Sequence, residues 1–218
     1  MRTEKVGKLS IDTKSSPNGK RGYHHGDLRK SLMHAALYLI EEHGIRGFTL
    51  KDAAQMAGVS PAAPYRHFPD KQALIAAIHL EGFELFYETM SASYNCTNQP
   101  AERLEELGVA YVMFALEHPA HFRVMFGRGL DESHAETVSD KGFLLLIQAV
   151  AELYPSVPSE KRHDIVLSAW SLVHGFALLQ MEGAFQVAGG IPNVEIQLRR
   201  LLRPTTISSP IASPTAGS

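Results

Sequence analysis

Sequence features that identify disulfide-rich, secreted or membrane proteins are scarce or absent here. The only cysteine in 218 residues is Cys96, which excludes an intrachain disulfide framework and favours a reducing, cytoplasmic compartment. The basic residues near the N-terminus are not followed by the apolar run of a secretory signal. The longest apolar region, 165–181, is interrupted by polar side chains, which predicts a buried helix and no membrane association.

Motifs of the common enzyme classes are missing as well. No nucleophile elbow, phosphate-binding loop or dinucleotide fingerprint occurs. His118 and His121 suggest a metal pair, but Pro119 interrupts a helix between them, and the His-Glu-x-x-His spacing of zinc peptidases is absent. The neighbours His24 and His25 are poorly placed to share one ion. We therefore predict no metal site, no cofactor and no catalysis.

What remains is the composition of an ordinary globular protein with an uneven distribution of charge. Hydrophobic residues make up 44% of the chain and charged residues 20%. Residues 1–72 carry 12 Lys and Arg against 7 Asp and Glu, whereas residues 73–218 carry 9 against 16. A basic front end on an acidic body is suited to attracting phosphates at one end of the molecule. A solvated basic arm would give the same excess.

A pair of short helices is predicted in the first third of the chain. Thr49 is suited to cap the first of them, and Asp52 three residues later completes a capping-box pattern. Gly58 is placed to end this helix in a left-handed conformation. Ser60 is expected to cap a second helix that begins at Pro61, where no N–H is needed.

The segment 49–68 therefore predicts a helix-turn-helix, the unit that places its second helix in the major groove of DNA. Pro64 removes one backbone hydrogen bond and predicts a distorted first turn in that second helix. Its groove-facing end consists of Pro and Ala and has no side chain for a bidentate base contact. Thymine-methyl contacts by Ala62 or Ala63, together with DNA shape, are the remaining means of sequence readout.

These residues also resemble a known family. The runs 58–60 (Gly-Val-Ser), 65–68 (Tyr-Arg-His-Phe) and 70–74 (Asp-Lys-Gln-Ala-Leu) are similar to the DNA-binding domain of TetR-type transcriptional regulators. The resemblance extends over residues 23–86 and preserves spacing as well as residue type. It implies an N-terminal DNA-binding domain of three helices followed by a helical ligand domain.

The resemblance further implies that operator DNA is held mainly through its phosphates. Thr49 and Tyr65 would bond phosphates beside the groove, and His67 and Lys71 would add contacts from the next turn and helix. Arg66 lies on another helical face. The alternative to a phosphate contact is that its side chain is solvated or paired with an acidic neighbour. The full set of candidate DNA-binding residues is Thr49, Lys51, Ser60, Pro61, Ala62, Ala63, Tyr65, Arg66, His67 and Lys71, with Arg21 and Tyr23 ahead of the first helix.

Helical periodicity continues through the rest of the chain, and no strand is predicted, so the fold class is all-α. The expected helices are 27–43, 71–94, 101–118, 119–126, 141–154, 158–184 and 193–203, besides the helix-turn-helix. Four regions follow from this pattern. They are a flexible basic arm (1–22), a DNA-binding domain (23–72), a ligand-binding and dimerisation domain (73–203) and a disordered tail (204–218).

The second domain is expected to enclose a cavity for a small, mostly apolar effector. Trp170, His174 and Gly175 resemble the Trp…His-Gly signature of one TetR ligand-domain subfamily. His174 would be the polar anchor, and Gly175 would permit close approach of helices. The candidate lining residues are Tyr111, Phe114, Phe122, Met125, Phe126, Trp170 and His174, all of which could instead form ordinary core.

The predicted function is that of a ligand-responsive repressor. One helix-turn-helix reads half a site, so a homodimer is expected on a pseudo-palindromic double-stranded operator, with 158–184 and 193–203 as its four-helix interface. An effector would shift 119–126 and, through it, the helix that begins at Lys71. A DNA-binding adaptor without a small ligand is the alternative, and a metal-dependent enzyme is a distant one.

Overall fold

The computed structural model describes residues 28–127 and 141–203, and every regular element within those ranges is helical. The all-α prediction is confirmed. The predicted basic arm, the C-terminal tail and Asp27 lie outside the described residues. The elements are α1 (Leu28–His43), α2 (Leu50–Met56), the 3-10 helix η1 (Ala63–Arg66), α3 (Lys71–Asn95), α4 (Pro100–Glu117), α5 (Pro119–Phe126), α6 (Lys141–Leu153), α7 (Ser159–Met181), the 3-10 helix η2 (Ala184–Ala188) and α8 (Val194–Leu202).

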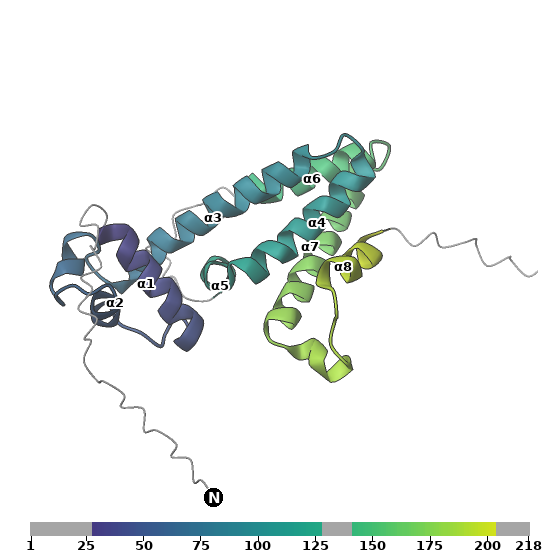
Figure 1. The fold of residues 1–218 in the computed structure, drawn as a ribbon. Helices are drawn as coiled ribbons and strands as arrows, with labels where there is room; N and C mark the ends of the chain where they lie inside the picture. Colours follow the sequence, from purple (N-terminus) through teal and green to yellow (C-terminus); the bar gives the residue numbers. More distant parts are fainter. Residues whose placement is uncertain (1–27, 128–140, 204–218) are drawn as a thin grey trace, which may run out of the picture.

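Two groups of helices are joined by the long helix α3 (Figure 1). The first group holds α1, α2 and η1, and α3 runs from it along the second group, in which it packs against α4, α5 and α6. At about 1.5 Å per residue, the 25 residues of α3 form a rod that reaches well beyond a small DNA-binding module. Any tilt of this rod therefore moves the first group relative to the second.

The first group has its own apolar core, in which α1, α2 and the first half of α3 meet. Leu32, Ile40 and Leu74 are fully buried there. Thr49 caps α2, because its side chain accepts from the Asp52 N–H and the Asp52 carboxylate accepts from the Thr49 N–H at 2.7 Å. The predicted capping box is confirmed.

The second helix of the predicted pair differs from expectation. It is only the 3-10 helix η1 and has no side-chain cap, so the prediction that Ser60 caps a helix beginning at Pro61 is wrong. Pro64 has no N–H to donate to the Ser60 carbonyl, and the Ala63 N–H bonds this carbonyl instead, at 3.0 Å. The backbone consequently tightens into a 3-10 turn, which is the distortion that Pro64 predicts.

The core of the second group is built around aromatic rings that meet edge to face. Phe86 of α3 contacts Tyr111 and Phe114 of α4, with ring centroids 5.4 and 5.2 Å apart. Phe122 of α5 packs against Tyr111 at 5.8 Å. Because such contacts favour defined relative orientations of the rings, a shift of one helix is passed to its neighbours.

Helix α5 belongs to both cores. Ala120 and Val124, four residues apart, are buried against α1 and α3 in the first core. Phe122 and Met125 are buried in the second core. Met125 also lies close to the backbone of α3, since a Cβ added at Gly82 of α3 would be 2.8 Å from the Met125 sulfur. The eight residues of α5 thus connect the two groups of helices directly.

Helix α7 is apolar but poorly covered within the chain. Its length and composition would allow it to cross a membrane, with a mean hydropathy of 1.3, although one such helix is weak evidence and only 22% of it is buried. The exposed leucines on it are Leu167, Leu172, Leu178 and Leu179. Gly183 adopts a left-handed φ of 69°, and α7 ends at Met181, before the predicted Ala184.

Gly175 lies on this exposed part of α7. A Cβ added there meets no atom within 4 Å. The expectation that Gly175 permits close approach of helices is therefore wrong for contacts within the described chain. The close approach that the sequence predicts for this glycine occurs instead at Gly108, where an added Cβ would lie 2.6 Å from the Leu202 side chain.

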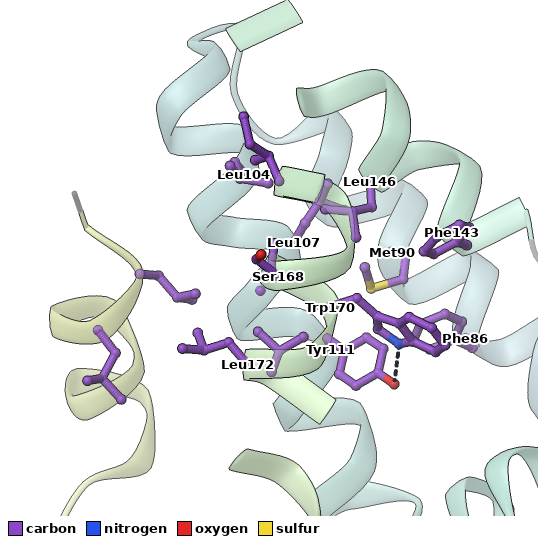
Figure 2. A pocket seen from close by; sticks show the side chains of 17 residues that line it. Phe86, Met90, Leu104, Leu107, Tyr111, Phe143, Leu146, Ser168, Trp170 and Leu172 are labelled. Atoms are coloured by element: carbon purple, nitrogen blue, oxygen red, sulfur yellow. Dashed lines mark hydrogen bonds between the residues drawn. The ribbon is translucent and has the colours of Figure 1, made fainter. Parts of the chain in front are cut away.

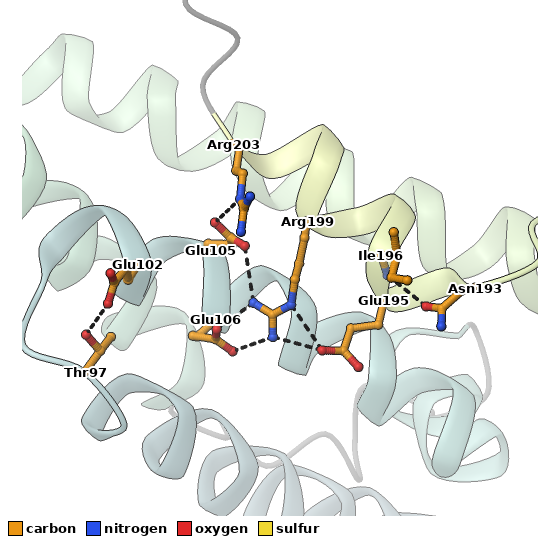
Figure 3. Close-up of polar contacts among 9 residues, drawn as sticks. All are labelled: Thr97, Glu102, Glu105, Glu106, Asn193, Glu195, Ile196, Arg199 and Arg203. Atoms are coloured by element: carbon orange, nitrogen blue, oxygen red, sulfur yellow. Dashed lines mark hydrogen bonds and ion pairs between the residues drawn. The ribbon is translucent and has the colours of Figure 1, made fainter.

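Helix α8 is held against α4 by an ionic cluster (Figure 3) and by the burial of an apolar side chain. The Arg199 guanidinium donates to Glu106 at 2.6 and 3.1 Å, to Glu105 at 3.2 Å and to Glu195 at 3.0 Å. These carboxylates, Glu106 foremost, raise the pKa of Arg199 further above its ordinary range. Leu198, the residue before Arg199, is fully buried in the second core.

Candidate DNA-binding surface and effector cavity

Most of the candidate DNA-binding residues are exposed, and they lie at the start of α2 and on and before η1. Thr49 and Lys51 lie in the first turn of α2, and both are exposed. Tyr65 on η1 is 51% exposed, so its ring and hydroxyl are open to a partner. The other predicted residues that are exposed here are Ser60, Pro61, Ala62, Arg66 and His67, whereas Ala63 is half-buried. This surface offers hydroxyl, phenol, imidazole and guanidinium donors, the groups that phosphates accept from.

Two buried residues fix this surface from beneath. Pro64 and Phe68 are buried, and the Pro64 carbonyl accepts from the N–H groups of His67 and Phe68, both at 2.9 Å. The Arg29 guanidinium lies 5.4 Å from the centre of the Phe68 ring. The exposed side chains of η1 are thus carried on a backbone that is anchored in the first core.

Lys71 is directed inward rather than toward this surface. Its ammonium donates to the Phe48 carbonyl at 2.7 Å and lies 4.2 Å from the centre of the Phe48 ring. Burial lowers the pKa of Lys71. It therefore joins the loop before α2 to the start of α3, a structural contact that the sequence did not indicate. Arg21 and Tyr23 lie outside the described residues.

A cavity of about 310 Å³ lies in the second group of helices (Figure 2). Its walls come from α3, α4, α6, α7 and α8. None of the described residues that line it is charged, and most are aliphatic or aromatic. The lining residues are Phe86, Met90, Leu104, Leu107, Gly108, Tyr111, Gly142, Phe143, Leu146, Ile165, Ser168, Ala169, Trp170, Leu172, Val173, Leu201 and Leu202.

Three polar side chains at the edge of this cavity are bonded to one another. The Trp170 indole N–H donates to the Tyr111 hydroxyl at 3.2 Å, and this hydroxyl lies 2.7 Å from Nδ1 of His174. Since the indole only donates, the hydroxyl proton is available to Nδ1, which matches a neutral His174. Burial lowers the pKa of His174, in the same direction. His174 is thus a hydrogen-bonded, half-buried imidazole.

The predicted ligand residues are divided between two cavities and the core. Tyr111 and Trp170 line the first cavity. Phe122, Phe126 and His174 line a second cavity instead, nearer to α1. The remaining two predicted residues, Phe114 and Met125, are buried in the aromatic core and line neither. For these two the alternative of ordinary core describes the structure.

No group of three or more metal-binding side chains occurs among residues 28–127 and 141–203. The rings of His118 and His121 lie 5.9 Å apart, and Nε2 of His121 is bonded to Glu81 at 3.1 Å. Burial lowers the pKa of His121 despite this carboxylate. These side chains therefore form part of the contact between α3 and α5.

Comparison with known proteins matches both halves of the chain to one family. Residues 32–78 match the family described as bacterial regulatory proteins, tetR family. Residues 104–203 match the tetracyclin repressor-like C-terminal domain. The chain belongs to the TetR family. It is accordingly a DNA-binding transcriptional regulator with a helix-turn-helix.

Curated relatives of this TetR-family protein have similar descriptions. The uncharacterized HTH-type transcriptional regulator YobS of Bacillus subtilis is 26% identical over 162 residues, which are 74% of this chain and 83% of YobS. A second HTH-type regulator, Rv0681 of Mycobacterium tuberculosis, is 24% identical over 71% of each chain. Neither description names an effector, and the Trp…His-Gly subfamily stays a prediction.

Solved structures share the fold. A protein of unknown function from Rhodococcus sp. RHA1 aligns with a TM-score of 0.64 and 28% identity, over 84% of this chain and all of that one. A bacterial regulatory protein of the tetR family from Rhodococcus RHA1 aligns with a TM-score of 0.63 and 20% identity, over 80% of this chain and 92% of its own. The second likeness shows the fold alone.

Most residues that line the first cavity of this TetR-family chain were not anticipated from the sequence. Leu104, Leu107 and Tyr111 recur on α4 at spacings of three and four, which indicates a shared face but not what it faces. Ser168 interrupts the apolar run of α7, and it lines the cavity. The Ser168 hydroxyl within an otherwise apolar run was thus the one feature of the sequence that pointed to α7 as a wall of the cavity.

Proposed function

We propose that this regulator is a ligand-responsive repressor that binds a pseudo-palindromic operator as a homodimer and is released by a small, mostly apolar effector. The observation that carries the proposal is the position of the first cavity. Phe86 and Met90 on its wall belong to α3, and the first half of α3 lies in the core beneath the DNA-binding surface. A molecule in the cavity would press on α3, whose first half packs beneath this surface.

The chemistry of the lining supports a neutral effector. A cavity of about 310 Å³ is at the small end of ligand pockets, and the part of the chain that the structure describes gives it no charged side chain to receive an ion. Tyr111 and Trp170 are bonded to each other, which leaves the Ser168 hydroxyl as a hydrogen-bonding group for a ligand. We therefore expect a compact apolar molecule with one polar substituent.

Helix α5 offers the route by which a displacement caused by the ligand would be transmitted to the DNA-binding surface. Its residues Phe122 and Met125 lie in the second core, and Ala120 and Val124 lie in the first. A displacement of the Tyr111 ring would act on Phe122, whose ring centre is 5.8 Å away. The same rigid helix would then press on α1 and α3. Couplings of this kind are typically about 1–3 kcal/mol.

The homodimer is supported by the uncovered apolar surface of α7 and α8. Leu172 and Leu179 on α7 are about 44–45% exposed, and Ile196 and Leu201 on α8 are about half exposed. Long apolar helices left open in one chain are typical of interfaces between subunits. Gly175 lies within this surface with free space around it, so a partner's helix could approach its backbone closely. Two recognition surfaces would then engage sites about 34–36 Å apart.

The experiment that tests the proposal fills the cavity without touching the DNA-binding surface. Ala169 lines the cavity on α7, and Ala169→Leu should occupy part of its volume. Operator affinity, measured by fluorescence anisotropy on a selected operator, should stay unchanged. Its decrease on addition of neutral apolar compounds, about 5–150-fold for a coupling of the usual size, should be lost.

The matched control is Ala101→Leu, an exposed alanine on α4 that is remote from the cavity lining. This variant should respond to the compounds as the unmodified protein does. If compounds that bind the cavity leave operator affinity unchanged in the unmodified protein, the regulator acts as an adaptor without a small ligand. An unchanged response in Ala169→Leu would remove the cavity from the mechanism.

A further inference from the structure

A second cavity lies at the junction of the two groups of helices. It has a volume of about 440 Å³ and is bounded by the loop after α1, by the end of α5 and by α7. Phe122, Phe126 and Leu178 contribute an apolar wall. This junction is distinct from the effector cavity, with which it shares no lining residue.

The charged lining of this junction cavity is entirely basic. Arg46 comes from the loop after α1, His43 is the last residue of α1, and Arg123 comes from α5. No acidic side chain is among the described residues that line it. A cavity bounded by two guanidinium groups attracts anions, and guanidinium groups match the planar or tetrahedral oxygens of carboxylates and phosphates.

One of these guanidinium groups has an unsatisfied donor. Nη1 of Arg123 is buried, and it has no hydrogen-bond partner within the part of the chain that the structure describes. Buried donors of charged groups are normally bonded, because leaving one without an acceptor is costly. Arg123 lines the cavity, and a turn of its guanidinium group toward an oxyanion bound there would give Nη1 the acceptor it lacks.

We propose that the junction cavity binds an organic oxyanion with an apolar body. The oxyanion would pair with Arg123 and Arg46, and the apolar body would rest on Phe122, Phe126 and Leu178. A carboxylate and a phosphate ester share this chemistry. The site differs from the effector cavity in charge, and its ligand therefore belongs to a different chemical class.

Such an anion would connect the two halves of the molecule. Arg46 belongs to the loop that leads into α2, whereas Arg123 lies on the helix that joins both cores. A bridging anion would hold the DNA-binding group in one position relative to the second group. His174 lines this cavity, and its Nδ1 is hydrogen-bonded to Tyr111 of the effector cavity, so one hydrogen bond links the two linings. The effect on operator binding rests on the proposed function, but anion binding itself does not.

The test compares two aromatic anions with a neutral aromatic alcohol. Binding of benzoate, phenyl phosphate and benzyl alcohol to the full chain is measured by isothermal titration calorimetry without DNA. We expect at least one of the two anions to bind more tightly than benzyl alcohol. Arg123→Gln should weaken that anion at least tenfold and leave benzyl alcohol unchanged. Arg46→Gln, at an exposed position, should also weaken it and keeps the test informative if the first variant does not fold.

The control is Lys161→Gln, which removes one positive charge at an exposed position of α7 outside the cavity. It should leave anion affinity unchanged. Equal affinities for the anions and benzyl alcohol, or equal losses in Lys161→Gln and Arg123→Gln, would overturn the proposal. The anion whose affinity falls in Arg123→Gln identifies the headgroup, a carboxylate or a phosphate ester. Loss of the effector response in Ala169→Leu bears only on the first cavity, so the two proposals fail separately.

Discussion

At the scale of single residues, Thr49 and Ser60 show how the same local signal can succeed or fail. Both are hydroxyl residues placed before a predicted helix. Thr49 is followed by three residues with free N–H groups, and its side chain caps α2. Ser60 is followed by Pro61 and Pro64, which lack N–H groups, and the segment forms a 3-10 helix without a side-chain cap.

This difference gives a prediction for the stability of the first group of helices. Thr49→Ala should lower the free energy of unfolding by about 1 kcal/mol, because the Asp52 N–H loses its acceptor. Ser60→Ala should have little effect. Thermal unfolding followed by circular dichroism, without DNA, measures both. Equal effects of the two substitutions would contradict the assignment of the cap.

At the scale of elements, α8 depends on a few contacts with α4. Arg199 bonds Glu105, Glu106 and Glu195, and its side chain is 28% exposed. Leu202 lies against Gly108 of α4. A nine-residue helix is too short to be stable by itself, so these contacts decide whether α8 stays in place.

We therefore predict that Arg199→Gln loosens α8 and weakens the proposed dimer. The dimer dissociation constant should rise about tenfold, which corresponds to about 1.4 kcal/mol. Sedimentation velocity over a range of concentrations measures this change. Arg200→Gln at the neighbouring exposed position is the control and should leave the constant nearly unchanged. A similar change in both variants would mean that general charge, rather than the ionic cluster, is responsible.

At the scale of the whole molecule, the exposed part of α7 gives the sharpest test of the dimer. Gly175 has open space around it within the chain, so Gly175→Leu should leave the fold of the single chain intact. The same side chain would block a partner's helix at this position. We expect circular dichroism to show unchanged helix content while sedimentation shows a shift to monomer. A variant that remains fully dimeric would place the interface elsewhere.

One buried and two half-buried histidines give the whole molecule a predicted dependence on pH. Burial lowers the pKa of His79, His121 and His174 below the ordinary value of 6.5. The unfolded chain consequently binds more protons than the folded one as the pH falls below 6.5. The free energy of unfolding should therefore be greatest above this pH and decrease below it.

Chemical unfolding between pH 7.5 and pH 5.5, on either side of the ordinary histidine value, measures this dependence. His121→Gln should reduce the slope, because it removes one ring that must be protonated on unfolding. Ser60→Ala serves as the reference, since it changes no titrating group. A slope that is the same in both variants would show that His121 does not contribute.

Local interactions account for what the sequence predicted correctly. The helices from α3 to α6 begin and end within about a residue of expectation, because caps, prolines and apolar spacing act over a few residues. The capping box at Thr49 and the left-handed Gly58 belong to the same class, as does the distortion caused by Pro64. The runs of identical residues that resemble TetR regulators are also local.

Only the tertiary structure decided which side chains face each other. Tyr111 meets Trp170 and His174, about 60 residues further along the chain, and Arg199 of α8 reaches Glu105 and Glu106 of α4. Whether an aromatic residue lines a cavity or fills a core depends on such distant partners, so Phe114 and Tyr111 could not be told apart from their spacing. The sequence by itself determined the helices and the family, because these follow from interactions between near neighbours. The cavities, the inward Lys71 and the open surface at Gly175 required the packing of the helices.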